Sequence, residues 1–126
     1  MKYLGIDYGK KKVGLAISEG LSASPFQVIE SSGLADAVSR IEKIIHQHQI
    51  DRVVIGLAES GESRSMTEKF IALLKKMIDV IVVEETLSSY YADEQMRMLG
   101  VAKSKRGRND AVAATYILEQ YLDSLK

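Results

Sequence analysis

Apolar and polar positions alternate with the period of β-strands in the first part of the chain. This alternation predicts three strands, at Lys2–Asp7, Lys12–Ser18 and Pro25–Glu30. Gly9-Lys10-Lys11 separates the first two strands as a tight turn, which indicates a β-hairpin. Pro25 is tolerated at the start of the third strand, because the N–H that it lacks costs little there. Three strands are therefore expected before the first helix.

Helical spacing begins at Leu34, where apolar residues recur every three or four positions as far as about Gln49. Asp51–Leu57 follows as a nearly continuous apolar run, which is typical of a strand covered on both faces. We therefore expect this strand near the centre of the sheet. Ser65 and Glu68 form a capping-box pattern before a second apolar stripe, so a second helix is expected to begin there.

The last third of the chain predicts one more strand and two more helices. Val80–Val83 is apolar throughout and ends at Glu84-Glu85, which predicts a buried strand. A helix is expected from about residue 88 to Gly100, and Asn109 can cap a final helix. The resulting order, β-β-β-α-β-α-β-α-α, predicts a mixed α/β sheet with right-handed crossovers between its parallel strands.

Composition restricts the class of protein further. The 126 residues fit one compact domain, residues 1–126. The 17 basic and 17 acidic residues cancel, so the net charge indicates no partner. The chain has no cysteine, which excludes a thiolate site, and its two histidines cannot form a zinc site alone, so we expect oxygen ligands for any metal. With no signal-peptide pattern and no apolar run long enough for a membrane span, we expect a cytoplasmic protein without membrane contact.

Three acidic positions are unusual: Asp7 within the first strand, Glu84-Glu85 at the end of the last strand, and Asp110 in the first turn of the final helix. A charge inside an apolar strand is costly unless a group of opposite sign meets it. If the first and last strands both flank the central strand, the acids can meet at the carboxyl ends of strands, where ligands usually bind. A hard cation such as Mg²⁺ would neutralise them and could support phosphodiester hydrolysis.

Each acid also has a purely structural explanation. Asp110 can complement the positive end of a helix dipole, and taken alone this is the better explanation for it. Glu84 and Glu85 can be solvated strand ends. Asp7 has no evident structural use, because its strand otherwise consists of small and apolar residues.

Glycines and basic residues supply candidate phosphate contacts. Gly5, Gly9 and Gly14 are most simply turn or packing residues, although Gly9 would also let a phosphate approach the backbone beside Lys10 and Lys11. A basic loop over residues 101–108 precedes Asp110, and its charges could contact nucleic-acid phosphates. A charge run of this kind is more often a solvated loop, but here it lies next to a candidate metal ligand. The basic residues of this loop are Lys103, Lys105, Arg106 and Arg108.

The chain resembles the YqgF family of bacterial proteins, described as Holliday junction resolvases and as nucleases that mature the 5′ end of pre-16S ribosomal RNA. The resemblance runs from end to end, and its opening and closing motifs are the specific ones. The matching segments are LGIDYGKKKVGLAIS, VVIGL, VVEETLSSYYA and NDAVAATYILEQYLDS.

The resemblance implies an RNase H-like fold, a five-stranded mixed sheet flanked by helices, with the first three strands antiparallel. It also implies that Asp7, Glu85 and Asp110 are the catalytic acids and hold Mg²⁺, for which Mn²⁺ can substitute. The chain departs from the family in several places: Glu84 stands in place of an Asp, Ala58 in place of a proline, and the loop Glu59–Arg64 is shorter. In addition, Thr86 stands in place of an Arg. This last change removes a cation that could neutralise a phosphate near the metal.

These patterns favour a metal-dependent nuclease that acts on structured RNA or branched DNA, in rRNA maturation or in junction resolution. A nucleic-acid-binding module of ribosome assembly that has lost efficient catalysis is the alternative that Thr86 allows. An ATPase fragment with a similar glycine-Asp-x-Gly hairpin is disfavoured, because such proteins need two related domains. Both RNA and DNA remain open as substrates, a pre-ribosomal particle remains open as a partner, and the protein can be a monomer or a homodimer.

Overall fold

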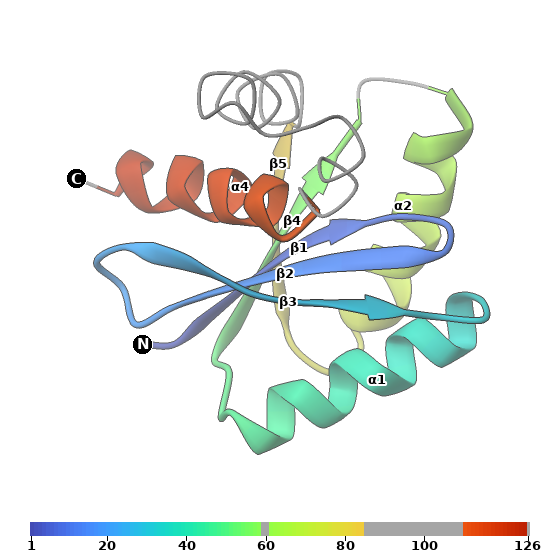
Figure 1. The fold of residues 1–126 in the computed structure, drawn as a ribbon, viewed down its shortest axis with the longest axis horizontal. Helices are drawn as coiled ribbons and strands as arrows, with labels where there is room; N and C mark the ends of the chain where they lie inside the picture. Colours follow the sequence, from blue (N-terminus) through green and yellow to red (C-terminus); the bar gives the residue numbers. More distant parts are fainter. Residues whose placement is uncertain (59–60, 85–109, 126) are drawn as a thin grey trace, which may run out of the picture.

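The structure is a computed structural model that describes residues 1–58, 61–84 and 110–125. The described residues form one sheet and the helices that cover it (Figure 1). In chain order the elements are β1 (Tyr3–Tyr8), β2 (Lys12–Ser18), β3 (Ala23–Glu30), α1 (Leu34–Gln47), β4 (Arg52–Leu57), α2 (Gly61–Leu74), β5 (Asp79–Glu84) and α4 (Asp110–Ser124).

The sheet has five strands in the order β3-β2-β1-β4-β5. β2 is antiparallel to both β1 and β3, whereas β4 is parallel to β1 and to β5. The carboxyl ends of β1, β3, β4 and β5 therefore lie together with the start of β2. We call this the carboxyl edge of the sheet; it is marked by Asp7, Lys12, Glu30, Leu57 and Glu84.

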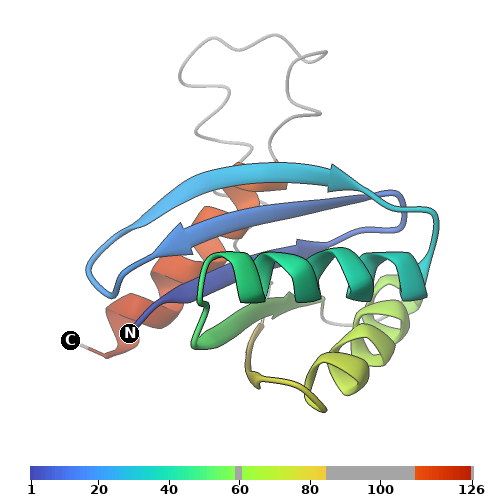
Figure 2. The same cartoon turned by 90° about the horizontal axis from the view of Figure 1, so that it is seen from below.

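Helices cover the two faces of the sheet unequally (Figure 2). α1 and α2 pack on one face, where alternate strand residues such as Leu4, Ile6 and Ile55 form the larger core with Ile41 and Phe70. α4 packs on the other face, which we call the α4 face. Its core contains Tyr3, Ala16, Val54, Ala114, Ile117, Leu118 and Leu122. Fully burying a large apolar side chain contributes roughly 1.5–3 kcal/mol of transfer free energy. Burial of several such side chains on each face therefore stabilises the packing of the helices on the sheet.

The predicted mixed α/β sheet is confirmed, as are its five strands and the antiparallel arrangement of the first three. The strand after α1 is buried from Val53 to Leu57, as its apolar run predicts, although the middle position belongs to β1. β1 and β5 both flank β4, which is the condition for the acidic positions to meet.

Two predictions about the second half of the chain are wrong. α2 begins at Gly61 and not at Ser65, so the polar residues before Ser65 are already helical. Among them, Arg64 is held by a contact outside the helix, since its Nη1 donates to the Ala58 carbonyl oxygen at 2.9 Å. β5 is an outermost strand and only partly covered, with Val82 40% exposed, so it is not a buried strand.

The helix expected from residue 88 to Gly100, the basic loop over residues 101–108 and the Asn109 cap lie outside the described residues. In the part of the chain that is described, no helix is long and apolar enough to cross a membrane.

Candidate metal and nucleic-acid site at the carboxyl edge

Asp7 lies on the α4 face of the sheet. It pairs with Gly14 across β1 and β2, and the two residues of such a pair face the same side of the sheet. Gly5, two residues earlier on the same strand face, lies so close to α4 that an added Cβ would be 2.9 Å from the Ala114 carbonyl oxygen. Asp7 is also the only residue of β1 that is not fully buried. Its carboxylate therefore lies beside α4 at the carboxyl edge.

Gly14 brings the start of α4 to Asp7. A Cβ added to Gly14 would lie 2.0 Å from the Asp110 carbonyl oxygen and 2.9 Å from the Ala111 nitrogen, so the helix backbone occupies the space that a side chain would need. The Cα atoms of a cross-strand pair such as Asp7 and Gly14 are only about 4.5–5.5 Å apart. Asp7 and Asp110 are thus neighbours on one face, although 103 positions separate them in the sequence.

The surroundings of Asp110 act on its charge in two opposing ways. Burial raises the pKa of the Asp110 carboxyl above its ordinary value, and the positive charge of Lys12 lowers it. Lys12 lies two residues before Gly14 on β2, hence on the same strand face, which explains its influence. The sequence offers Lys12 only as a member of a lysine run, so its relation to Asp110 depends on the contact between β2 and α4.

Lys10 and Lys11 lie at the same edge, in the turn between β1 and β2. A Cβ added to Gly9 would lie 2.5 Å from the Lys12 carbonyl oxygen, so Gly9 is required by the tightness of this turn. The turn forms one wall of a cleft of about 540 Å³, which we call the Lys10–Gly33 cleft. Its lining residues are Lys10, Lys11, Lys12, Glu30, Ser31, Ser32 and Gly33.

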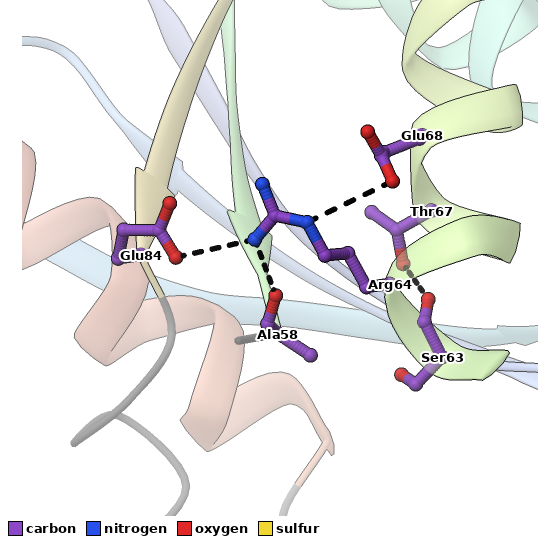
Figure 3. Close-up of polar contacts among 6 residues, drawn as sticks. All are labelled: Ala58, Ser63, Arg64, Thr67, Glu68 and Glu84. Atoms are coloured by element: carbon purple, nitrogen blue, oxygen red, sulfur yellow. Dashed lines mark hydrogen bonds and ion pairs between the residues drawn. The ribbon is translucent and has the colours of Figure 1, made fainter. Parts of the chain in front are cut away.

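Arg64, near the start of α2, joins three elements at the carboxyl edge (Figure 3). Its Nη1 donates to the Ala58 carbonyl oxygen at 2.9 Å and lies 3.6 Å from Glu84 Oε2, while its Nε lies 3.7 Å from Glu68 Oε1. Glu84 pairs with Leu57, whose side chain belongs to the core under α1 and α2. Glu84 is therefore directed towards α2 and not towards Asp7. Sequence reasoning missed Arg64, because two of its partners lie outside α2, Ala58 directly after β4 and Glu84 at the end of β5.

The structure brings together Asp7 and Asp110, and it places Gly9, Lys10 and Lys11 at the same edge. Glu85, Thr86 and the basic residues Lys103, Lys105, Arg106 and Arg108 lie outside the described residues. Among residues 1–58, 61–84 and 110–125, no three His, Cys, Asp or Glu side chains form a group that could hold a metal ion. The described residues thus contain two of the three acids of the expected metal site.

Comparison with known proteins matches the whole chain to one family. The sequence model of the family described as "RuvX: Holliday junction resolvase" matches residues 1–124. A protein of Agathobacter rectalis is 33% identical over 99% of this chain and 96% of its own length. A protein of Maridesulfovibrio salexigens is 37% identical over 97% of this chain and 98% of its own length. Both carry the provisional name pre-16S rRNA nuclease.

Solved structures show the same fold at low sequence identity. Thermus thermophilus RuvC, solved in complex with a Holliday junction substrate, matches with a TM-score of 0.64 and 16% identity over 99% of this chain and 95% of that chain. The fowlpox virus Holliday junction resolvase matches with a TM-score of 0.61 and 15% identity over both chains in full. The fold is thus that of RuvC, an RNase H-like resolvase. With a family match over residues 1–124 and relatives above 30% identity, the chain belongs to the RuvX (YqgF) family of nucleases.

Proposed function

We propose that this protein is a metal-dependent nuclease that hydrolyses phosphodiester bonds in structured nucleic acid, with maturation of the 5′ end of pre-16S rRNA in the cytoplasm as its role. The observation that carries the proposal is the close approach of Asp110 to β2 at Gly14, directly beside Asp7. Two carboxylates on one face at a sheet edge repel each other, and a bound cation would relieve this repulsion. The names of the relatives support RNA as the substrate.

Asp7, Glu85 and Asp110 are the proposed catalytic acids and metal ligands. The donor set fits Mg²⁺, and Mn²⁺ as its substitute, since these ions prefer carboxylate oxygen and the chain has no cysteine. Of the neighbouring glutamates we choose Glu85, because Glu84 already interacts with Arg64 on the α2 side. When bound, the metal supplies charge stabilisation to the attacking water and the leaving oxygen. Lys12 favours the ionised form of Asp110 that a metal needs.

Basic residues on both sides of the acids are proposed to hold the substrate. Gly9, Lys10 and Lys11 lie at the carboxyl edge, and the sequence places Lys103, Lys105, Arg106 and Arg108 shortly before Asp110. Lysine and arginine bind the phosphates of any nucleic acid, so these residues give affinity without choosing between RNA and DNA.

The proposal is tested by comparing the wild-type protein with Asp7→Asn on a structured fragment of pre-16S rRNA in the presence of Mg²⁺. We expect Asp7→Asn to lower the cleavage rate by about 100-fold or more, since even outer partners of metal ligands cost 10–100-fold. Asp79→Asn, the same change at an exposed position at the start of β5, is the control and should retain the wild-type rate. Equal rates for wild type and Asp7→Asn would reject the proposed site.

Resolution of Holliday junctions is the second candidate, favoured by the description of the family and by the fold shared with RuvC. Faster cleavage of a four-way DNA junction than of the RNA fragment would favour it. Such an activity needs two paired active sites and hence a homodimer. Binding of the RNA or of a pre-ribosomal particle without cleavage, unchanged by Asp7→Asn, would instead show a binding module, as Thr86 in place of arginine allows.

A further inference from the structure

The Lys10–Gly33 cleft has the charge expected of a site for an anion. Three of its lining residues are lysines and one, Glu30, is acidic, so the lining carries a net positive charge in a protein whose total charge is zero. The three lysines are exposed, and their charged groups can therefore reach a ligand in the cleft. Phosphate groups of nucleic acids are the anions that lysines of a nuclease meet.

Backbone contacts hold the walls of the cleft together before any ligand binds. The Ser31 N–H donates to the Lys11 carbonyl oxygen at 3.0 Å, which joins the β1–β2 turn to the segment before α1. The Ser32 N–H donates to Asp36 Oδ2 at 3.0 Å, which fixes that segment on the first turn of α1. A set of charges on a preformed wall binds an anion with less loss of freedom than the same charges on a solvated loop.

Ser31, one of the residues that line the cleft, carries a hydroxyl group that needs a partner. Ser31 Oγ is buried and makes no hydrogen bond within the described residues. A buried polar group without a partner is costly, and such groups often mark a place where a ligand or water completes the structure. Gly33, the residue before α1, also lines the cleft, and the Asp36 carboxylate in the first turn of α1 already supplies a negative charge at this helix end.

Lys12 connects the cleft to the two aspartates. It lines the cleft, and it lies on the α4 face two residues before Gly14, which touches the Asp110 backbone. A nucleic-acid strand cut at Asp7 and Asp110 can therefore place its next phosphate in the cleft.

We propose that the Lys10–Gly33 cleft is a subsite for one backbone phosphate of the nucleic-acid strand, next to the phosphodiester bond that is cut. The inference rests on the proposed function for the identity of the strand. It adds Lys12 and Ser31 to the substrate contacts. It also proposes a path for the strand over the protein surface, from the aspartates across the β1–β2 turn to the start of α1.

The first test measures the affinity for a four-way DNA junction at several salt concentrations, with Ca²⁺ in place of Mg²⁺ so that the substrate stays intact. The double variant Lys10→Gln/Lys11→Gln should lower the slope of log Kd against log salt by about 1 for each phosphate that the variant no longer neutralises. Lys75→Gln/Lys76→Gln is the matched control. It removes two adjacent exposed lysines after α2, near the start of β5 and away from the carboxyl edge, and should leave the slope unchanged.

The second test separates a built subsite from a diffuse basic surface. Ser31→Ala should weaken binding without changing the salt slope, because it removes a hydrogen bond but no charge. In NMR spectra the amide signals of Ser31, Ser32 and Gly33 should shift when the junction is added. No shift at these amides, together with wild-type affinity of Ser31→Ala, would overturn the subsite even if the lysine variant binds more weakly.

Failure of this inference can be told from failure of the proposed function. A protein that cleaves in an Asp7-dependent way but whose Lys10→Gln/Lys11→Gln variant keeps the wild-type slope has the proposed function and lacks the subsite. A protein that never cleaves, yet shows the amide shifts and the reduced slope, has the subsite and lacks the proposed catalysis.

Discussion

Two aspartates share one face of the sheet because Gly14 leaves room for the start of α4. The surroundings of Asp110 are unfavourable for its charge, since burial raises the pKa of its carboxyl. A buried carboxylate costs stability, and groups that cost stability are common at functional sites, where stability is given up for activity. We propose that Asp110 is a metal ligand and does not merely complement the dipole of α4.

These two roles of Asp110 predict opposite effects of Asp110→Asn on thermal stability without metal. The folded protein holds the Asp110 proton more tightly than the unfolded chain, whose pKa is near 3.8, so the ionised carboxylate costs stability above the raised pKa. Asp110→Asn should therefore raise the melting temperature near pH 7. The difference should shrink as the pH falls through the raised pKa and vanish below about 3.8.

Glu62→Gln provides the control for this prediction. Glu62 is the acidic residue of the first turn of α2, where a negative charge favours the helix, so the change should lower the melting temperature slightly at pH 7. A similar decrease for Asp110→Asn would show that Asp110 merely complements the helix dipole.

The sequence already identifies Asp7, since a charge within an apolar strand stands out in the alternation. Asp110 is less distinct, because an acid at the start of a helix has an ordinary explanation. The role of Gly14 cannot be read from the sequence, where it resembles any packing glycine. It depends on a contact between β2 and α4 that only the folded chain makes.

Elements are predicted well where one face or both faces of them are buried, because burial fixes the periodicity of their sequences. β4 and α1 are examples, and both lie within two residues of their predicted bounds at each end. The start of α2 is predicted four residues too late. Its first turns are polar, and Arg64 contacts Ala58, directly after β4, and Glu84 at the end of β5, so tertiary contacts and not a local capping box decide where the helix begins.

The packing of α4 on β2 can be tested with Gly14→Ala. The added Cβ would lie 2.0 Å from the Asp110 carbonyl oxygen, so the start of α4 must move away from β2. We expect a loss of roughly 1–3 kcal/mol in the free energy of unfolding, as for other overpacked sites, measured by urea denaturation. Cleavage should fall as Asp110 moves away from Asp7.

Gly5→Ala is the matched control for the shift of α4. Its Cβ would meet Ala114 and Leu118 at 2.9 Å, so a smaller movement suffices and the contact lies further along the helix. This variant should lose some stability and keep most of its activity. If Gly14→Ala cleaves at the wild-type rate, whether or not its free energy of unfolding changes, the position of Asp110 does not matter for cleavage.

Within residues 1–58, 61–84 and 110–125, the charged functional candidates gather at one edge of the sheet. The strand order β3-β2-β1-β4-β5 places the carboxyl ends of four strands there, and each candidate within the described residues lies at or next to one of them or at the start of α4. The RNase H-like fold and the family membership agree with a nuclease. Neither distinguishes RNA from DNA, because both present the same phosphodiester to the metal.

The central claim is that Asp7 and Asp110 hold a divalent metal together with Glu85. Crystals soaked in Mn²⁺ test it most directly, because the anomalous scattering of Mn²⁺ locates the ion independently of activity. We predict Mn²⁺ bound by the carboxylates of Asp7, Asp110 and Glu85 in the wild-type protein, and no such peak in Asp7→Asn. The claim would be contradicted if the carboxylates of Asp7 and Asp110 were too far apart to share one metal or a pair of metals, and if Mn²⁺ bound elsewhere or not at all.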